Sequence, residues 1–367
     1  MIRSHYPLPT THYPLLTMSN FFSKHENAFG LDLTGSSFKL FQLKKDGKQI
    51  KVLGYSDVSL PKGLIINDTI ADAKTFTYLF RQAVSRPQYG KLEGTQVIAS
   101  LPESKSFVRV IQIPLMSEAE IETAVPVEAE SFIPLPIDQV YLDWQKLAVK
   151  EGKQEILIIA SPKEFVDKYL QILEGAGLKV LAFEVESQSC HRSLIGFNAK
   201  STSLILDLDS FRASLIMVED GNLQFTSSIP IAGSSFTEAI ARSLGVSSQK
   251  AEIIKRKVGI ANTAEYPNIK TALLPVINNL TAEIKNIIKF HTEHSPNKVE
   301  KIILAGGSAK LKNLAESLDQ VFKADGISVE IGNPWLNLPE IKSPPFDLYD
   351  SLSYTTALGL AMRGIME

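Results

Sequence analysis

The stretch AFGLDLTGSSFKL, residues 28–40, decides the fold. Apolar residues lie on both sides of a short run of Thr, Gly and Ser, a pattern that predicts two strands joined by a tight turn. The pair Asp46-Gly47 then predicts a hairpin at the far end of the second strand. The first ordered part of the chain is therefore expected to be a strand, a polar turn, a second strand and a hairpin.

The same order of features returns in the second half of the chain. The stretch SLILDLDSFRASLI, residues 203–216, is again apolar on both sides of a serine-containing turn, and Asp220-Gly221 follows it. Asp32 and Asp207 hold matching places, 207 − 32 = 175 positions apart in a chain of 367. This spacing predicts two related α/β halves. The alternative is a chance likeness between two short hairpins.

Composition excludes several broad classes of protein. The chain has 38 Lys and Arg against 40 Asp and Glu, so its formal charge of -2 argues against general attraction to nucleic acid or anionic lipid. The single Cys190 has no partner for an internal disulfide, which fits a reducing compartment. No apolar run reaches the ~20 residues that a membrane-spanning helix needs.

The order of predicted elements divides the chain into two domains. We expect a disordered extension at 1–27, a first domain at 28–202 and a second domain at 203–367. Residues 1–17 lack the apolar core of a signal peptide, and Met18 is the alternative start of the protein.

Each domain is expected to carry a smaller unit. Strands and a helix at about 102–181 predict an inserted α/β unit in the first domain. Helical periodicity at about 234–300 predicts a helical subdomain in the second. Within the inserted unit, the segment FIPLP at 132–136 predicts a stiff apolar connector, which is either a docking surface or ordinary core.

The two turns and a later glycine pair are the candidate binding elements. A turn of Thr, Gly and Ser offers backbone N–H groups and hydroxyls to an anion, and an aspartate beside it is placed to hold the waters of Mg²⁺. Gly306-Gly307 follows a predicted strand and lets a flat ligand or a phosphate lie against the backbone. Glu252 and Lys255, one helical turn apart, could hold a ribose and base. The alternatives are simple turns, self-capping aspartates and an exposed ion pair.

These pieces, in this order, resemble the actin, heat-shock chaperone and sugar-kinase superfamily, and more narrowly the PilM family of type IV pilus assembly proteins, which is related to FtsA. The resemblance covers roughly 29–364. The matching stretches are GLDL at 30–33, SSFKL at 36–40, EAESFIP at 128–134, AEIIK at 251–255, LAGG at 304–307, GNP at 332–334 and ALGLAMRG at 357–364. The acidic Ile-Pro connector and the closing stretch are the more specific to PilM.

The resemblance implies a two-domain actin-like fold that binds ATP and Mg²⁺. It would place Asp32, Thr34, Gly35, Ser36 and Ser37 at the β- and γ-phosphates, with Lys39 nearby, and would have Asp32 and Asp207 hold Mg²⁺ through water. Ser210 and Arg212 would lie in the second phosphate turn, and Gly233 would close on the phosphates. Glu252 and Lys255 would contact the ribose and adenine, and Gly306, Gly307 and Ser308 would line the nucleoside.

Two departures from the family pattern weaken this expectation of nucleotide binding. Thr34-Gly35 stands where the family tends to have Gly-Ser, and Asp209 stands where a glycine is common. A carboxylate near phosphates repels them unless it faces Mg²⁺ or turns away.

The resemblance also implies a role. A PilM-like protein would lie at the cytoplasmic face of the inner membrane, bind the cytoplasmic tail of PilN in a groove of its first domain, and link it to the pilus motor ATPases. We expect weak or absent ATP hydrolysis. The rivals are a kinase of the same superfamily, in which Glu184 or Glu186 activates a water or hydroxyl, and an FtsA-like filament-forming protein.

Overall fold

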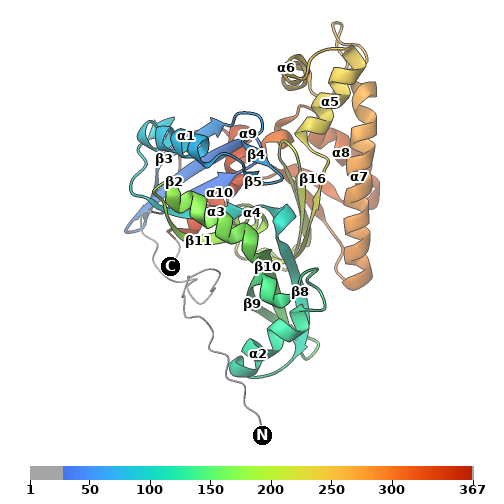
Figure 1. Ribbon diagram of the computed structural model, residues 1–367. Helices are drawn as coiled ribbons and strands as arrows, with labels where there is room; N and C mark the ends of the chain where they lie inside the picture. Colours follow the sequence, from blue (N-terminus) through green and yellow to red (C-terminus); the bar gives the residue numbers. More distant parts are fainter. Residues whose placement is uncertain (1–27, 366–367) are drawn as a thin grey trace.

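The computed structural model describes residues 28–365. The predicted extension at 1–27, the choice between Met1 and Met18, and the last two residues therefore lie outside the described part. Two mixed sheets form the molecule, and helices cover both (Figure 1). Within residues 28–365, no helix has the length and apolar content needed to cross a bilayer.

The first sheet has six strands in the order β11-β7-β1-β2-β3-β6. β1 pairs antiparallel with β2 and β2 with β3, while β7 runs parallel to both β1 and β11. The strands are β1 (Phe29–Leu33), β2 (Ser37–Asp46), β3 (Gln49–Ser59), β6 (Tyr89–Gly90), β7 (Gln96–Leu101) and β11 (Lys179–Val185).

The second sheet repeats this layout and then continues. Its order β16-β15-β12-β13-β14 has the same strand directions as β11-β7-β1-β2-β3, which matches the duplication predicted from Asp32 and Asp207. These strands are β12 (Ser203–Leu208), β13 (Ala213–Glu219), β14 (Asn222–Ile229), β15 (Lys301–Ala305) and β16 (Ser328–Ile331).

The inserted unit extends the second sheet, although in sequence it lies between β7 and β11, two strands of the first sheet. Its strands β8, β10 and β9 continue from β14, and helix α2 packs on them through a core of its own. Its elements are β8 (Phe107–Pro114), α2 (Glu118–Ala129), η3 (Ile137–Gln139), β9 (Val140–Lys150) and β10 (Lys153–Pro162). We use "inserted unit" below for 107–162. The sequence suggested an end near Leu181, but β11 pairs with β7 and helix α3 packs in the core of the first sheet.

The remaining helices are divided between the two sheets. Those near the first sheet are α1 (Ala73–Ser85), α3 (Lys163–Gly175), α4 (Glu186–Leu194), α9 (Leu348–Ser351) and α10 (Thr355–Arg363). Those on the second are α5 (Gly233–Leu244), α6 (Ser248–Val258), α7 (Ile269–His294) and α8 (Leu314–Phe322). α5, α6 and the start of α7 form the predicted helical subdomain, at the end of the molecule opposite α2 (Figure 1).

Short elements complete the cleft between the halves. The hairpin of β4 (Ile65–Ile66) and β5 (Thr69–Ile70) and the 3-10 turn η2 (Glu103–Lys105) lie on the first half, and η4 (Gly307–Lys310) follows β15 on the second. The turn η5 (Lys323–Asp325) lies between α8 and β16, and the loop at 332–347 and η6 (Leu352–Tyr354) lead the chain back to the first sheet.

Candidate functional site

The first turn, 34–37, is shaped by the hydroxyl of Thr34. This oxygen accepts from the backbone N–H of Ser37 at 3.2 Å and of Ser36 at 3.5 Å, and it donates to the Ser37 carbonyl at 3.0 Å. The Thr34 N–H also donates to that carbonyl at 2.9 Å. Thr34 therefore fixes the turn by accepting the N–H groups of Ser36 and Ser37, which are engaged inside the turn.

The second turn, 209–212, is fixed by the start of α5. The N–H groups of Gly233 and Ser234 donate to the carbonyls of Asp209 (3.0 Å) and Ser210 (2.7 Å). The Ser308 hydroxyl donates to the same Asp209 carbonyl at 2.8 Å. These contacts use backbone atoms of Asp209, a residue that also lines the cavity between the turns.

The two turns face each other across the cleft. The Ser36 hydroxyl donates to the Ser210 hydroxyl at 2.8 Å. Gly35 lies so close to Phe211 that an added Cβ would be 2.8 Å from the ring. Beside this contact is a cavity of about 320 Å³ lined by Leu33, Thr34, Gly35, Ile65, Asn67, Asp68, Pro102, Glu103, Ser104, Glu186, Asp209, Ser210, Phe211, Arg212, Ser214 and Ser228.

Arg212 lies on the second-half wall of this cavity. Its Nε donates to the Ser228 hydroxyl at 2.8 Å and its Nη2 to the Ser228 carbonyl at 3.3 Å. Ser228 belongs to β14, so the guanidinium is held against the sheet while it borders the cavity. It brings a positive charge next to the two turns.

Next to the turns, three aspartates, Asp32, Asp207 and Asp209, share one nearby lysine, Lys39. Asp32 and Lys39 are both buried, at 4% and 6% exposure, and Lys39 Nζ donates to the Ser37 hydroxyl at 3.1 Å. Burial raises the pKa of Asp32 to about 7, against the lowering effect of Lys39. The pKa of Lys39 is raised, because nearby aspartates outweigh its own burial.

Asp207 is the counterpart of Asp32 in the second half. It accepts a hydrogen bond from the Cys190 thiol at 3.3 Å, and burial and the nearby Asp209 raise its pKa well above the ordinary value. Burial also raises the pKa of Asp209. Raised values mean that these carboxylates lack sufficient positive charge around them.

Carboxylate oxygens of this kind suit Mg²⁺. Among residues 28–365, however, no three Asp, Glu, His or Cys side chains stand close enough together to hold a metal ion directly. Asp32 and Asp207 have raised pKa values that a nearby cation would lower, so the pair fits an ion held through its water shell.

The residues expected at the nucleoside lie together on the second half, beside the cavity rather than in its wall. Lys255 Nζ donates to the Gly233 carbonyl at 2.9 Å and pairs with Glu252 at 2.7 Å. Burial raises the pKa of Glu252, but hydrogen bonds from Lys255, Thr237 and Arg256 outweigh this effect and lower the pKa to about 2. Burial lowers the pKa of Lys255.

Two of the predicted glycines are required by close packing here. Gly306 has φ +80°, and a Cβ on it would lie 2.4 Å from Asp207 Oδ1 and 2.5 Å from the Leu208 carbonyl. A Cβ on Gly233 would lie 2.3 Å from the Ser308 hydroxyl. Gly307 is less crowded, with its nearest such contact at 3.6 Å. The backbone after β15 thus lies directly against the end of β12.

Two glutamates, Glu103 and Glu186, line the cavity, although they were not predicted from the sequence as binding-site residues. The Glu103 N–H donates to Glu186 Oε2 at 3.1 Å, and the Ser187 N–H donates to Glu103 Oε2 at 3.3 Å. The hydroxyl of Thr226, on β14, donates to Glu103 Oε1. Burial raises the pKa of both Glu103 and Glu186. The available signal was the position of Glu103 just after a buried strand and of Glu186 at a helix start.

Glu184, the other carboxylate considered for catalysis, lies outside the cavity. It is fully buried and pairs with Arg192 at 2.6 Å and Arg363 at 2.9 Å. Those guanidiniums lower its pKa against the effect of burial. Glu184, on β11, therefore forms structural ion pairs with Arg192 of α4 and Arg363 of α10.

Comparison with known proteins agrees with this geometry. The sequence model of the family described as type IV pilus assembly protein PilM matches residues 30–365. A solved PilM-PilN type IV pilus biogenesis complex has a TM-score of 0.79 at 27% identity, covering 94% of this chain and 100% of that one. MreB 5 of Spiroplasma citri bound to AMPPNP has a TM-score of 0.54 at 12% identity, covering 92% and 96%.

A more distant likeness is to a cell division protein. The cell division protein FtsA of Pseudomonas aeruginosa is 23% identical over 214 residues, which is 52% of this chain and 49% of that protein. The chain thus spans about half the length of the curated relative. The fold expected from the sequence, a two-domain actin-like α/β fold, is confirmed by the solved neighbours.

Proposed function

Because this chain belongs to the family of the type IV pilus assembly protein PilM, we propose that it is an ATP-binding scaffold of the type IV pilus assembly complex. The observation that carries the proposal is the pair of facing turns, 34–37 and 209–212, which border one cavity with Asp32 and Asp207 behind them. Matching turns from two duplicated halves can enclose a chain of phosphates from both sides.

Each group at the site has a role in this proposal. The first turn and Lys39 hold the β- and γ-phosphates, and Ser210 and Arg212 contact them from the second half. Asp32 and Asp207 hold Mg²⁺ through water, and the ion's charge lowers the pKa values that burial and the neighbouring Asp209 raise. Glu252, Lys255, Gly306, Gly307 and Ser308 surround the nucleoside next to Gly233.

The departures from the family pattern fit the geometry. Thr34 supports the first turn with its hydroxyl, and the Asp209 carboxylate joins the other aspartates near the proposed ion. Glu186 lines the cavity, but its Oε2 accepts the Glu103 N–H at 3.1 Å, which ties this carboxyl to the backbone instead of leaving it to activate a water. We therefore propose that ATP is held rather than rapidly hydrolysed.

The proposed partner is the cytoplasmic tail of PilN, by analogy with the solved PilM-PilN complex. The inserted unit offers a surface for it. Phe132 and Leu135 on the connector are 39% and 37% exposed, and Leu115 and Val127 nearby in the sequence are 58% and 67% exposed, while Ile133 is buried. Binding PilN would place the chain at the cytoplasmic face of the inner membrane and link it to the pilus motor.

Nucleotide retention tests the first part of the proposal. The full chain is incubated with MgATP, desalted, and the bound nucleotide identified, with Asp207→Asn as the test variant and the exposed Asp46→Asn as its control. We expect ATP to stay with the parent and the control and to be lost from Asp207→Asn. Equal retention by all three proteins, or none by the parent, would contradict the assignment, and ADP with continued turnover would show an active ATPase.

Partner binding is tested with a synthetic peptide of the PilN tail from the same organism. Phe132→Ser is expected to weaken peptide binding at least tenfold in titration calorimetry, since it removes an exposed apolar side chain of the surface. Phe197→Ser removes a similarly exposed ring far from the connector in the sequence and should bind like the parent. Unchanged affinity of Phe132→Ser would place the surface elsewhere.

A further inference from the structure

The junction between the inserted unit and the second sheet has little backbone pairing. β14 and β8 share one register pair, Phe225 with Arg109, whereas β8 and β10 pair from Lys153–Pro114 to Ala160–Phe107. Backbone hydrogen bonds hold neighbouring strands together in proportion to the length of the ladder. Side chains must therefore supply most of the attachment at this junction.

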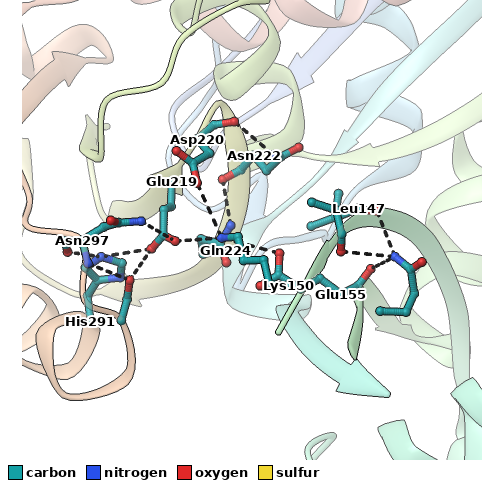
Figure 2. A network of polar contacts seen from close by, with 12 residues as sticks. Leu147, Lys150, Glu155, Glu219, Asp220, Asn222, Gln224, His291 and Asn297 are labelled. Atoms are coloured by element: carbon teal, nitrogen blue, oxygen red, sulfur yellow. Dashed lines mark hydrogen bonds and ion pairs between the residues drawn. The ribbon is translucent and has the colours of Figure 1, made fainter. Parts of the chain in front are cut away.

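A network of charged side chains crosses the junction at its outer end (Figure 2). Lys150 Nζ, at the end of β9, lies 2.9 Å from Glu219 and 3.6 Å from Asp220, which belong to the β13–β14 hairpin. It also lies 3.7 Å from Glu155 on β10, within its own unit. One lysine thus bridges carboxylates from both sides of the junction.

Glu219 is anchored on its own side independently of Lys150. It accepts from Ser295 Oγ at 2.7 Å and Asn297 Nδ2 at 2.9 Å, and His291 Nε2 lies 3.4 Å away (Figure 2). These residues end or follow α7. Burial would raise the pKa of Glu219, but hydrogen bonds from Ser295, Lys150 and Asn297 lower it. Glu219 therefore stays charged near neutral pH.

The charge balance of the network depends on Lys150. Glu155 and Glu219 are 6% and 5% exposed, and Asp220 is a third carboxylate beside them. Burial lowers the pKa of His291, so this side chain adds no positive charge near neutral pH. Lys150 itself is 33% exposed, but without it two poorly hydrated carboxylates would lose the cation that they share, which is unfavourable.

Aromatic side chains support the same junction further along. The Arg109 guanidinium on β8 lies 5.0 Å from the Phe132 ring of the connector and 5.8 Å from the Phe290 ring of α7. Phe225 on β14 packs edge-on against Phe290 at 5.0 Å. The connector is therefore in contact with the second half through one side chain.

We propose that Lys150 is a charge latch that holds the inserted unit on the second sheet, and that its release frees this unit to move as one body. The inserted unit has its own core around Ile113, Val125 and Ile158, so it can move without unfolding. Where the connector docks a partner, which rests on the function proposed above, the latch sets the position in which that surface is presented.

The distance between two spin labels tests the latch. Labels on Glu122→Cys in α2 and Glu293→Cys in α7 span the junction, and the native Cys190 is fully buried, so surface cysteines label selectively. Pulsed electron resonance should give one narrow distance in this background. Lys150→Met, which keeps the apolar stem and removes the charge, should at least double the width of the distribution or add a longer distance.

Two further variants separate charge from packing. Lys150→Met with Glu155→Gln removes one of the facing carboxylates and should restore much of the narrow distance, whereas a packing role for the stem predicts no rescue. Lys146→Met is the matched control, because Lys146 lies on the same strand but pairs with Glu118 inside the unit.

A Lys150→Met distribution like that of Lys146→Met would overturn the proposal. So would a broad distribution that Glu155→Gln leaves unchanged. No nucleotide or PilN peptide is present in the measurement, so its outcome does not depend on whether the chain retains ATP.

Discussion

The carboxyl group of Asp32 shows how a single residue reports on the state of the site. It is buried beside Lys39, and its pKa is raised to about 7. Between the ordinary value and pH 7, the folded chain therefore holds a proton that the unfolded chain has released. Raising the pH through this interval favours the unfolded state, and the loss is complete once the folded group has ionised.

Asp32→Asn should remove this pH dependence. In the absence of nucleotide, its melting temperature relative to the parent should rise from pH 5 to pH 7 and then stay constant, ending several degrees above the parent. Thermal unfolding at matched ionic strength gives the comparison, with Asp46→Asn as the control for the substitution itself. A difference between parent and Asp32→Asn that is the same at pH 5 and pH 8 would show that Asp32 is ionised throughout.

At the level of single residues, the positions of some side chains near the cavity were predictable from the sequence and those of others were not. Asp32 and Asp207 could be predicted because each ends an apolar strand beside a polar turn, a local pattern. Glu103 could not be, because its contacts are to Glu186 and Thr226, which lie 83 and 123 positions away. Glu184 and Glu186 are two positions apart in the sequence, yet Glu184 pairs with two arginines and Glu186 lines the cavity.

Among the elements, the crossing of α4 and α10 determines how the two halves are joined. α4 leads from the first sheet to the second, and α10 follows the chain's return to the first. Glu184 of β11 forms buried ion pairs with Arg192 of α4 and Arg363 of α10, and Arg192 also donates to the Gly359 carbonyl of α10 at 2.9 Å. Gly359 permits the close approach, because a Cβ there would lie 2.1 Å from the Ser189 carbonyl.

Gly359→Ala should force these helices apart. We expect a loss of roughly 2 kcal/mol or more in unfolding free energy, since the clash is with backbone and cannot be relieved by a rotamer change. Gly175→Ala, in α3, is the matched control, because nothing lies within 4 Å of its added Cβ and alanine favours the helix. Chemical denaturation measures both, and equal midpoints for the two variants would contradict the close crossing.

The elements themselves were largely predictable, and their pairing was less so. The strand, turn, strand and hairpin at 28–47 and 203–221 follow from apolar spacing and turn residues. So does the capping box of α2, in which the Ser117 N–H donates to Glu120 at 2.7 Å. The end of the inserted unit did not follow, because β11 joins the first sheet through parallel pairing with β7, about 80 positions earlier, which local periodicity does not record.

For the whole molecule, the cleft is closed where the two turns meet. Ser36 contacts Ser210, Phe211 covers Gly35, and Thr226 of the second sheet reaches Glu103 of the first half. These contacts surround the cavity, while Lys150 and Glu219 join the halves at the outer end of the same second sheet. A ligand that bridges the turns would therefore act on the closure of the entire molecule.

Gly35→Ala tests whether this closure matters for nucleotide. The added Cβ would lie 2.8 Å from the Phe211 ring, so the ring must move or the turns must separate. We expect ATP retention to fall several-fold in Gly35→Ala and to recover in Gly35→Ala with Phe211→Ala, where the obstacle is gone. Phe211→Ala alone, whose ring is 54% exposed, controls for the loss of its own contacts. If the double variant retains no more ATP than Gly35→Ala, the defect lies in the first turn itself, and contact between the halves does not limit nucleotide binding.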